Sequence, residues 1–338
     1  MRKSLKELRL GRRAWAGTLL SLTPMAAVSK PAKASDYPSS TITVTVPFAP
    51  AGATDLAGRL LAEKMGPALG PRARLVVENK PGAGSALGAE YVRRARPDGY
   101  TLLVGSASTL GVAPAAQPKI APYDPAEDFT PVAVIGTSAL GLVVPTASGI
   151  NTVQELVARL RKGEGRDGYA SSGVGGIGHL AASLFSKLAD APATHIPYRG
   201  GGSVPEALLK QEVLFTIDQI ASVVGQIRDG ALKLLAVTTT SRERSFPDVP
   251  TLQEAGVEGY ELSTWTVMVG PKGMPEEIAQ ALNRAANLAL ADPVVNRRLT
   301  ESGTDPRQDS TPESTREFLR EEFARFRRVV ETTGMRMD

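Results

Sequence analysis

Short β-branched segments alternate with longer segments of helical periodicity along most of the chain. Residues 42–48 (ITVTVPF) have the composition of a strand, and residues 55–69 repeat Leu and Met at helical spacing. The same alternation continues with predicted strands at 74–78 and 101–104 and a predicted helix at 85–95. Short apolar strands that alternate with helices predict an α/β fold with a mostly parallel sheet.

A second series of elements follows residues 111–125, a stretch rich in Pro and Ala that we expect to be irregular. Residues 132–135 and 141–144 are predicted as two strands separated by a short turn. Further strands are predicted at 169–171, 194–197, 214–217, 232–238 and 264–269, and helices at 152–161, from His179, from Val204, at 275–290 and at 313–330. The last helix has one apolar stripe among many charges, so it should lie on the surface with one face buried.

The first 34 residues follow a different pattern. Residues 1–13 are basic, residues 14–28 are mostly apolar and small, and Ala32-Lys33-Ala34 fits a cleavage site. This order predicts a secretory signal peptide, cleaved near Ala34, and a mature protein in a bacterial periplasm. The apolar run is too short to span a bilayer. Arg12-Arg13 loosely resembles a twin-arginine signal, so both this route and Sec export stay open.

Composition excludes several classes of function. The 338 residues include no cysteine, which excludes disulfides, thiol catalysis and thiolate metal sites, and only two histidines. Residues 1–34 hold eight Lys and Arg against one Glu, a net charge of +7. Because the whole chain carries +4, the remainder carries −3, which argues against a nucleic-acid partner. We expect no metal and no cofactor, and the length suggests two domains.

Small residues gather at four predicted junctions between a strand and the following helix. These junctions are residues 47–55 (PFAPAGATD), 80–88 (KPGAGSALG), 171–179 (SSGVGGIGH) and 198–205 (YRGGGSVP). In a parallel α/β sheet such loops lie at the carboxyl ends of the strands, where ligands usually bind. Glycine lets backbone N–H groups approach a ligand, and helix N-termini add unpaired donors. The pattern predicts a shared site for an anion, typically a carboxylate.

Other chemistry finds little support. Residues 173–178 match G-x-G-x-x-G, but the next predicted strand ends without the acidic residue that would hold a ribose, so nucleotide binding is not favoured. No nucleophile elbow, phosphate-binding P-loop or zinc-protease motif is present, and we assign no catalytic residue.

Five single residues have specific interpretations. Asp55 should cap or open a helix, and His179 should hydrogen-bond a loop or the ligand. His195 is interpreted as structural and Trp265 as a core residue. Asp218 follows an apolar run at a strand end, which is a plausible polar position in a cleft.

An ordered set of motifs across nearly all of the mature chain resembles the Bug family, the substrate-binding proteins of tripartite tricarboxylate transporters. The motifs are Pro47-Phe48-x-Pro50-x-Gly52-x-x-Asp55 with Arg59, Val77-Glu78-Asn79-Lys80-Pro81-Gly82-Ala83-Gly84, Pro97-Asp98-Gly99-Tyr100-Thr101, Tyr169-Ala170-Ser171-Ser172-Gly173-x-Gly175, His179-Leu180-Ala181, His195-Ile196-Pro197-Tyr198-Arg199-Gly200, Leu235-Ala236-Val237-Thr238 and Pro247-Asp248-Val249-Pro250-Thr251-x-x-Glu254-x-Gly256.

The resemblance implies a two-lobed periplasmic binding protein of the type II, Venus flytrap kind. Lobe 1 would comprise residues 40–138 and 250–338, and lobe 2 residues 139–249. The protein, expected to be a monomer, would close over a small di- or tricarboxylate, acidic amino acid or aromatic acid and deliver it to membrane permease subunits. The implied ligand contacts are Ala51, Gly52, Ala53, Thr54, Asp55, Ser106, Ser172, Gly173, His179 and Asp218.

Two departures from the family pattern bear on the ligand. The first loop has Ala51-Gly52 where the family usually has two glycines, and Thr109-Leu110-Gly111 stands where a His is common. The pocket should be more apolar on that side. Two alternatives remain: a receptor that serves only a periplasmic sensor, and a periplasmic hydrolase or isomerase that uses Asp55 or His179.

Overall fold

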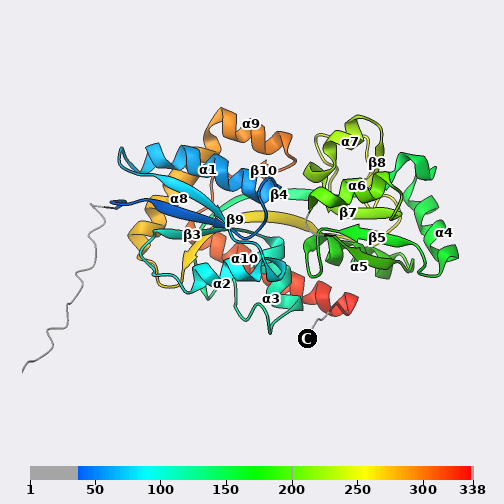
Figure 1. Ribbon diagram of the computed structural model, residues 1–338, viewed down its shortest axis with the longest axis horizontal. Coiled ribbons are helices and arrows are strands. Elements are labelled where there is room, and N and C mark those ends of the chain that lie inside the picture. Colours follow the sequence, from blue (N-terminus) through cyan, green and yellow to red (C-terminus); the bar gives the residue numbers. More distant parts are fainter. Residues whose placement is uncertain (1–36, 199–200, 336–338) are drawn as a thin grey trace, which may run out of the picture. The chain divides into compact units, whose positions relative to one another are not determined.

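A computed structural model describes residues 37–198 and 201–335, and within this part the strands form one mixed sheet (Figure 1). The predicted signal peptide, residues 1–34, lies outside the described residues. The strand order is β2-β1-β3-β9-β4-β7-β5-β6, and both β8 and β10 pair with β4. The strands are β1 (Ile42–Val46), β2 (Leu75–Asn79), β3 (Thr101–Ser106), β4 (Phe129–Pro145), β5 (Gly168–Ser171), β6 (Thr194–Pro197), β7 (Phe215–Gln219), β8 (Leu232–Val237), β9 (Ser263–Pro271) and β10 (Asp305–Pro306).

Helices cover the sheet and complete the α/β fold that the sequence predicts. They are α1 (Ala53–Leu69), α2 (Ala86–Arg93), α3 (Ala113–Ala116), α4 (Val153–Gly163), α5 (Ile177–Leu188), α6 (Val204–Leu209), α7 (Val224–Arg228), α8 (Glu276–Ala291), α9 (Pro293–Glu301) and α10 (Pro312–Thr333). None of these helices, within the described residues, combines the length and apolarity that a membrane crossing needs.

The sheet contains two groups of parallel strands joined by antiparallel ones. In the first strand group, β1 pairs in parallel with β2 and β3, and in the second strand group, β5 pairs in parallel with β6 and β7. Between them, β4 pairs antiparallel with β9 along its first part and with β7 and β8 along its last part. The described residues all belong to one compact unit, and the division into lobes at 139 and 249 stays a prediction.

The long strand β4 corrects one prediction. Residues 132–135 and 141–144 were expected to form two strands, but they belong to one strand of 17 residues. The expected turn between them is absent, and two glycines of β4 allow close packing instead: a Cβ at 136 would lie 2.6 Å from the carbonyl oxygen of Asp305, and one at 141 would lie 2.5 Å from the Leu234 side chain. Register shifts along β4 replace the expected break.

The stretch at 111–125 is also more ordered than predicted. A π-helical turn, Ser108–Val112, leads directly into α3. Gly111 lies against the ring of Phe326 on α10, where a Cβ would approach the ring to 2.5 Å. Tertiary packing therefore overrides the low helix propensity of Gly and Pro here.

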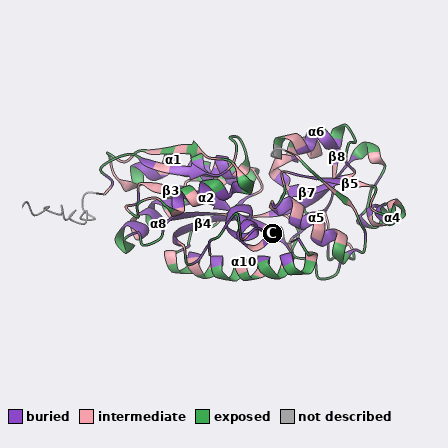
Figure 2. Ribbon diagram, turned by 60° about the horizontal axis from the view of Figure 1, so that its bottom comes forward, coloured by how far each residue is buried: buried purple, intermediate pink, exposed green. Residues whose placement is uncertain are grey.

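Helix α10 confirms the prediction of a surface helix with one buried face (Figure 2). Leu319, Phe326 and Val330 are buried, and Trp265 on β9 packs edge-on against Phe326. The indole Nε1–H of Trp265 donates a hydrogen bond to Glu322 at 2.7 Å. Trp265 is thus a core residue, as predicted, with its polar atom satisfied from α10.

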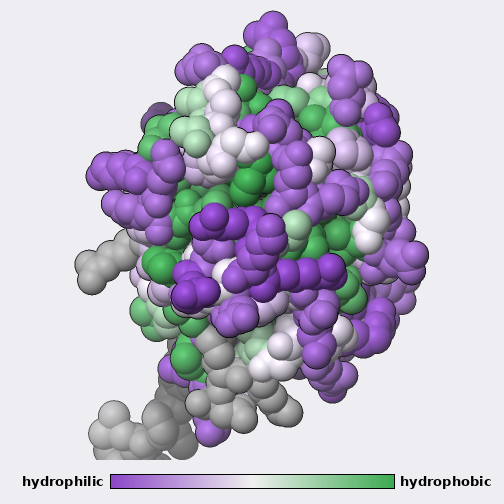
Figure 3. Space-filling model, turned by 90° about the vertical axis from the view of Figure 1, so that its right-hand side faces the viewer, coloured by the Kyte–Doolittle hydropathy of each residue, from purple (hydrophilic) through white to green (hydrophobic). Residues whose placement is uncertain are grey.

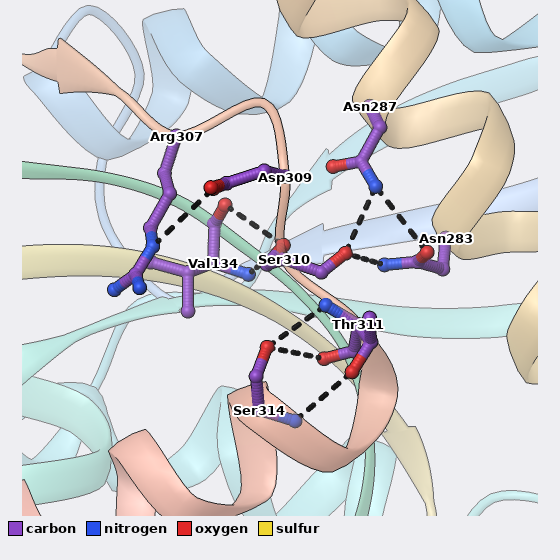
Figure 4. A network of polar contacts seen from close by, with 8 residues as sticks. All are labelled: Val134, Asn283, Asn287, Arg307, Asp309, Ser310, Thr311 and Ser314. Atoms are coloured by element: carbon purple, nitrogen blue, oxygen red, sulfur yellow. Dashed lines mark hydrogen bonds and ion pairs between the residues drawn. The ribbon is translucent and has the colours of Figure 1, made fainter.

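A polar network fixes the segment before α10 onto β4 (Figure 4). The side-chain amide of Asn283 donates to the carbonyl oxygens of Val132 and Ser310, each at 2.8 Å. The Ser310 hydroxyl accepts from the N–H of Val134, and Thr311 caps the helix in a reciprocal pair with Ser314.

On the side of the molecule that carries α4, hydrophilic side chains surround small apolar areas (Figure 3).

Candidate functional site

The four predicted loops each connect a strand to the next helix, and they contact one another in a series. The first loop (47–52) meets the second (80–85) at α2, where a Cβ on Gly88 would lie 2.7 Å from Pro47. A Cβ on Gly84 of the second loop would lie 3.6 Å from the Val174 carbonyl oxygen of the third loop (172–176). In the fourth loop, whose residues 199–200 lie outside the described residues, Tyr198 N–H donates to the Ser171 carbonyl at 2.9 Å.

A side chain from the first strand group contacts a helix of the second. The Ser108 hydroxyl, just beyond β3, accepts a hydrogen bond of 3.1 Å from the N–H of Ile177, the first residue of α5. First-turn N–H groups have no partner within their helix, so Ser108 satisfies one of the open donors of α5. Sequence reasoning missed Ser108, although it lies two residues from the predicted Ser106, which is itself buried at the end of β3.

The first loop is organised by Asp55, which is only 3% exposed. Its carboxylate accepts hydrogen bonds from Ala51 N–H at 3.0 Å, from Asn79 at 2.8 Å and from two guanidinium nitrogens of Arg59 at 2.9 and 3.1 Å. Burial alone would raise the pKa of Asp55, but the hydrogen bonds from Arg59, Asn79 and Ala51 together hold it below its usual value. The carboxylate therefore opens helix α1, as predicted, with both oxygens engaged by Ala51 of the loop, Arg59 of α1 and Asn79 of β2.

The other predicted residues of the first loop carry backbone donors. Ala51 is exposed and adopts a left-handed conformation, with φ 73°. Gly52 is the N-cap of α1 and has nothing within 4 Å of where a Cβ would stand. The first hydrogen bond of the helix joins Leu56 N–H to the carbonyl oxygen of Gly52. The N–H groups of Ala53 and Thr54 come before it, so they have no partner within the helix.

The second loop adds a buried residue that sequence reasoning did not single out. Ala83, Gly84 and Ser85 have φ values of 47°, 62° and 85°, three successive left-handed residues before α2. Ser85 is 3% exposed, and its hydroxyl has no hydrogen-bond partner in the described part of the chain. The sequence feature that could have identified Ser85 is its position in a Gly-rich loop before a helix.

The third loop is held by a pair of stacked histidines. The rings of His179 and His195 are 3.7 Å apart between centroids, and Tyr169 stacks on His195 at 5.0 Å. Nδ1 of His179 accepts from Gly175 N–H at 3.3 Å, and Nε2 of His195 lies 2.6 Å from the Ser171 hydroxyl. Burial and then the charge of His195 lower the pKa of His179 to about 4, and burial lowers that of His195. Both rings are therefore neutral at pH 7.

Asp218 stands at the end of β7 beside the first turn of α5. It is 5% exposed, and a Cβ on Gly178 would lie 3.4 Å from its Oδ2. Oδ1 accepts from the N–H of Gln219 at 2.8 Å, whereas Oδ2 has no hydrogen-bond partner among the described residues. Burial raises the pKa of Asp218 to about 6, against smaller opposing effects of Gln219 and the Ser172 hydroxyl. A buried carboxylate oxygen without a partner is costly.

Two predicted contacts remain, and both belong to the third loop. Ser172 is half-buried and lowers the pKa of Asp218, and Gly173 has φ 146°, with the Tyr198 carbonyl oxygen 3.9 Å from where its Cβ would stand. Within residues 37–198 and 201–335, no group of three His, Asp or Glu side chains is placed to hold a metal ion. Asp55 has Arg59, Asn79 and Ala51 as its partners, and His179 has Gly175 and His195, so within the described residues no hydrogen bond joins Asp55 to His179.

Comparisons with known proteins agree with the fold. Residues 57–335 match the family described as the tripartite tricarboxylate transporter family receptor. The protein BugT of Bordetella pertussis is 34% identical, over 92% of this chain and 95% of its own. The structure of MatC from Rhodopseudomonas palustris with bound malate has 34% identity and a TM-score of 0.81, and covers 87% of this chain and 100% of its own.

A second solved structure, Rpa4515 of Rhodopseudomonas palustris with adipate, has 31% identity and a TM-score of 0.82, and covers 88% of this chain and 99% of its own. The matched family is one of receptors, and a further similar structure, BugD, is described as a periplasmic binding protein, so the alternative of a hydrolase or isomerase is not supported. The resemblance to the Bug family is confirmed. The chain belongs to the receptor family of tripartite tricarboxylate transporters.

Proposed function

We propose that this protein captures a small carboxylate in the periplasm and delivers it to the membrane subunits of a tripartite tricarboxylate transporter. The observation that carries the proposal is the contact between four Gly-rich loops, two from each strand group, at the carboxyl ends of parallel strands. Helices α1 and α5 begin at these loops, and open N–H groups at helix N-termini suit a carboxylate.

Backbone amides are the main donors in this proposal. Two cations beside the loops are already paired, Arg59 with Asp55 and Lys80 with Glu78. The amides at the start of α1 are not committed to the helix, so they can meet a carboxylate directly or through water. The proposed ligand contacts are Ala51, Gly52, Ala53, Thr54, Asp55 (through the loop that it holds), Ser106, Ser172, Gly173, His179 and Asp218.

Closure of two lobes would trap the ligand. In this proposal residues 40–138 and 250–338 move against residues 139–249, and the bond between Ser108 and Ile177 belongs to the closed arrangement. A ligand shifts such an equilibrium only through contacts that it makes better in one state, so it must touch loops of both strand groups. We expect a monomer to suffice for this.

The ligands of the neighbours support the class of solute. Malate and adipate are both small dicarboxylates. A dissociation constant in the micromolar range, about −8 kcal/mol, would be ordinary for such a site. Di- and tricarboxylates, acidic amino acids and aromatic acids should therefore form the first panel in a thermal-shift screen, because a ligand at 100 times its dissociation constant stabilises the folded state by about 2.7 kcal/mol.

Ala53→Pro tests the backbone donors directly. Ala53 is the first residue of α1, and its neighbour Gly52 has an extended conformation, so Pro fits there without breaking the helix. The variant lacks one N–H group and should bind the ligand roughly 10-fold or more weakly, with little change in melting temperature. Glu276→Pro, at the exposed first position of α8, is the matched control. Equal affinity in all three proteins would contradict the proposal.

Delivery and export need separate tests. Deletion of the gene should abolish uptake of the ligand, whereas unchanged uptake with a lost transcriptional response would favour a receptor that serves only a sensor.

Mass spectrometry of the periplasmic form should find a chain that begins after Ala34. Replacement of Arg12 and Arg13 by Lys would block export only by the twin-arginine route.

A further inference from the structure

Asp218 differs from the other carboxylate of the site, although both are buried. Both carboxylate oxygens of Asp55 accept hydrogen bonds, from Ala51, Arg59 and Asn79. Asp218 is 5% exposed, and its Oδ2 has no hydrogen-bond partner in the described residues. The hydrogen bonds of the Asp55 carboxylate are thus all supplied by the protein, whereas among the described residues the Asp218 carboxylate keeps one strong acceptor without a donor.

The neighbours of Asp218 place this acceptor at the loops. Gly178, in the first turn of α5, packs on the carboxyl group, and the preceding residue Ile177 donates its N–H to Ser108 and not to Asp218. The Ser172 hydroxyl of the third loop lowers the pKa of Asp218, in opposition to the larger effect of burial. Asp218 is thus in contact with the segment that carries three of the proposed ligand contacts.

We propose that Oδ2 of Asp218 accepts a hydrogen bond from a hydroxyl or ammonium group of the ligand, so that the site selects carboxylates that carry such a donor next to the acid group. This inference rests on the proposed function and names the ligand class of the same site. Amides of the loops meet the carboxylate of the ligand, and Asp218 meets its donor.

The preference follows from the cost of leaving a buried acceptor unpaired. When an acid without a donor binds, Oδ2 of Asp218 would lose its contact with water and would receive no hydrogen bond in exchange. An acid with a hydroxyl or ammonium group replaces that water with a charge-assisted hydrogen bond. Sites built to bind a hydroxyl reject the analogue that lacks it far more strongly than apolar pockets reject a methylene group.

Ser85 of the second loop carries a similar signature. It is 3% exposed with an unpartnered hydroxyl in the described part of the chain. A hydroxyl can either donate or accept, so it does not choose between ligands. Asp218, when ionised, only accepts, and this restriction is what makes the class of ligand specific.

The test compares acids that differ by one hydroxyl group. Calorimetry at pH 7.5 would measure L-malate against succinate, 2-hydroxyglutarate against glutarate, and mandelate against phenylacetate, with L-aspartate and L-glutamate as ammonium-bearing acids. For the scaffold that binds best, the wild type should prefer the acid with the donor by about 10- to 100-fold. In Asp218→Asn this ratio should fall to within about threefold of one, through loss of affinity for the donor-bearing acid.

Control variants separate this inference from the proposed function. Asp229→Asn, on the exposed end of α7, should keep the wild-type ratio. If the wild type binds both members of each pair equally, or Asp218→Asn keeps the preference, the role of Asp218 is overturned while carboxylate binding stands. If no acid of the panel binds the wild type, the proposed function fails, and the inference fails with it. Circular dichroism of each variant establishes that it is folded.

Discussion

The imidazole rings of His179 and His195 lie face to face, with 3.7 Å between their centroids and 10° between their planes. The contact joins the start of α5 to β6 and supports the third loop through the bond from Gly175 N–H to His179. Two protonated rings at this distance would repel each other, and burial would make each positive charge unfavourable. The pair therefore holds its loop only while both rings are neutral.

We predict that the free protein loses stability as the pH falls from 6.5 towards 4. Burial and then His195 lower the folded-state pKa of His179 to about 4, below the value of about 6.5 in an unfolded chain, so the contribution is complete above 6.5 and disappears as the pH falls through 4. Melting temperatures between pH 7.5 and 4 should drop less steeply in His179→Gln than in the wild type. Parallel curves would show that the pair does not set this dependence.

Asp218→Asn should make the free protein more stable at neutral pH. Burial raises the folded-state pKa of Asp218 to about 6, above that of an unfolded chain, so the favourable state is the protonated one and its contribution is lost as the pH rises through 6. Removing the charge should raise the free energy of unfolding at pH 7.5 by about 1–3 kcal/mol. The gain should vanish near pH 4, and denaturant titration at both values measures it.

Asp229→Asn serves as the control for this prediction because Asp229 is exposed. A loss of stability in Asp218→Asn at pH 7.5 would mean that the carboxylate is paired in the free protein. A gain, together with the loss of ligand preference, would identify Asp218 as a residue whose function costs stability.

Asp55→Asn should destabilise the first loop. The substitution removes the charge that Arg59 contacts and one acceptor for Ala51, Asn79 or Arg59, so unfolding should become about 1–3 kcal/mol easier. Because the folded-state pKa of Asp55 is below its usual value, the loss should be full near neutral pH and should shrink in acid. Glu63→Gln, on the exposed side of α1, should change little. Equal stability of both variants would contradict the prediction.

Substitution of Ala51 and Ala53 by Gly should have opposite effects. Ala51 has φ 73°, a left-handed conformation that costs a non-Gly residue about 1–2 kcal/mol, so Ala51→Gly should raise the free energy of unfolding by up to about 1 kcal/mol. Ala53 begins α1, where Gly lowers helix stability by roughly 0.5–1 kcal/mol. Thermal denaturation of the two variants, two residues apart, compares the same chemical change in two backbone conformations.

Sequence reasoning predicted the α/β class and the loops because both depend on local patterns. Alternating β-branched and helical segments fixed the strands of both groups, and the clusters of Gly before helices marked the four junctions. It failed where long-range contacts decide. A turn was expected between residues 135 and 141, but Gly136 and Gly141 let Asp305 and Leu234 pack closely against one continuous strand. Ser108 and Ser85 were missed because only the packing of distant segments shows that, within the described part of the chain, the Ser108 hydroxyl has a hydrogen-bond partner and the Ser85 hydroxyl has none.

The position of β9 constrains how the chain can fold. It lies between β3 and β4, although it follows both by more than a hundred residues of sequence. A chain that emerges with its N-terminus first must keep the edges of β3 and β4 open until β9 arrives, and open strand edges invite mispairing. Such non-local pairing makes the joining of β3 to β4 through β9 a late, slow product of folding, so the chain remains vulnerable to aggregation and proteases until its last third has appeared.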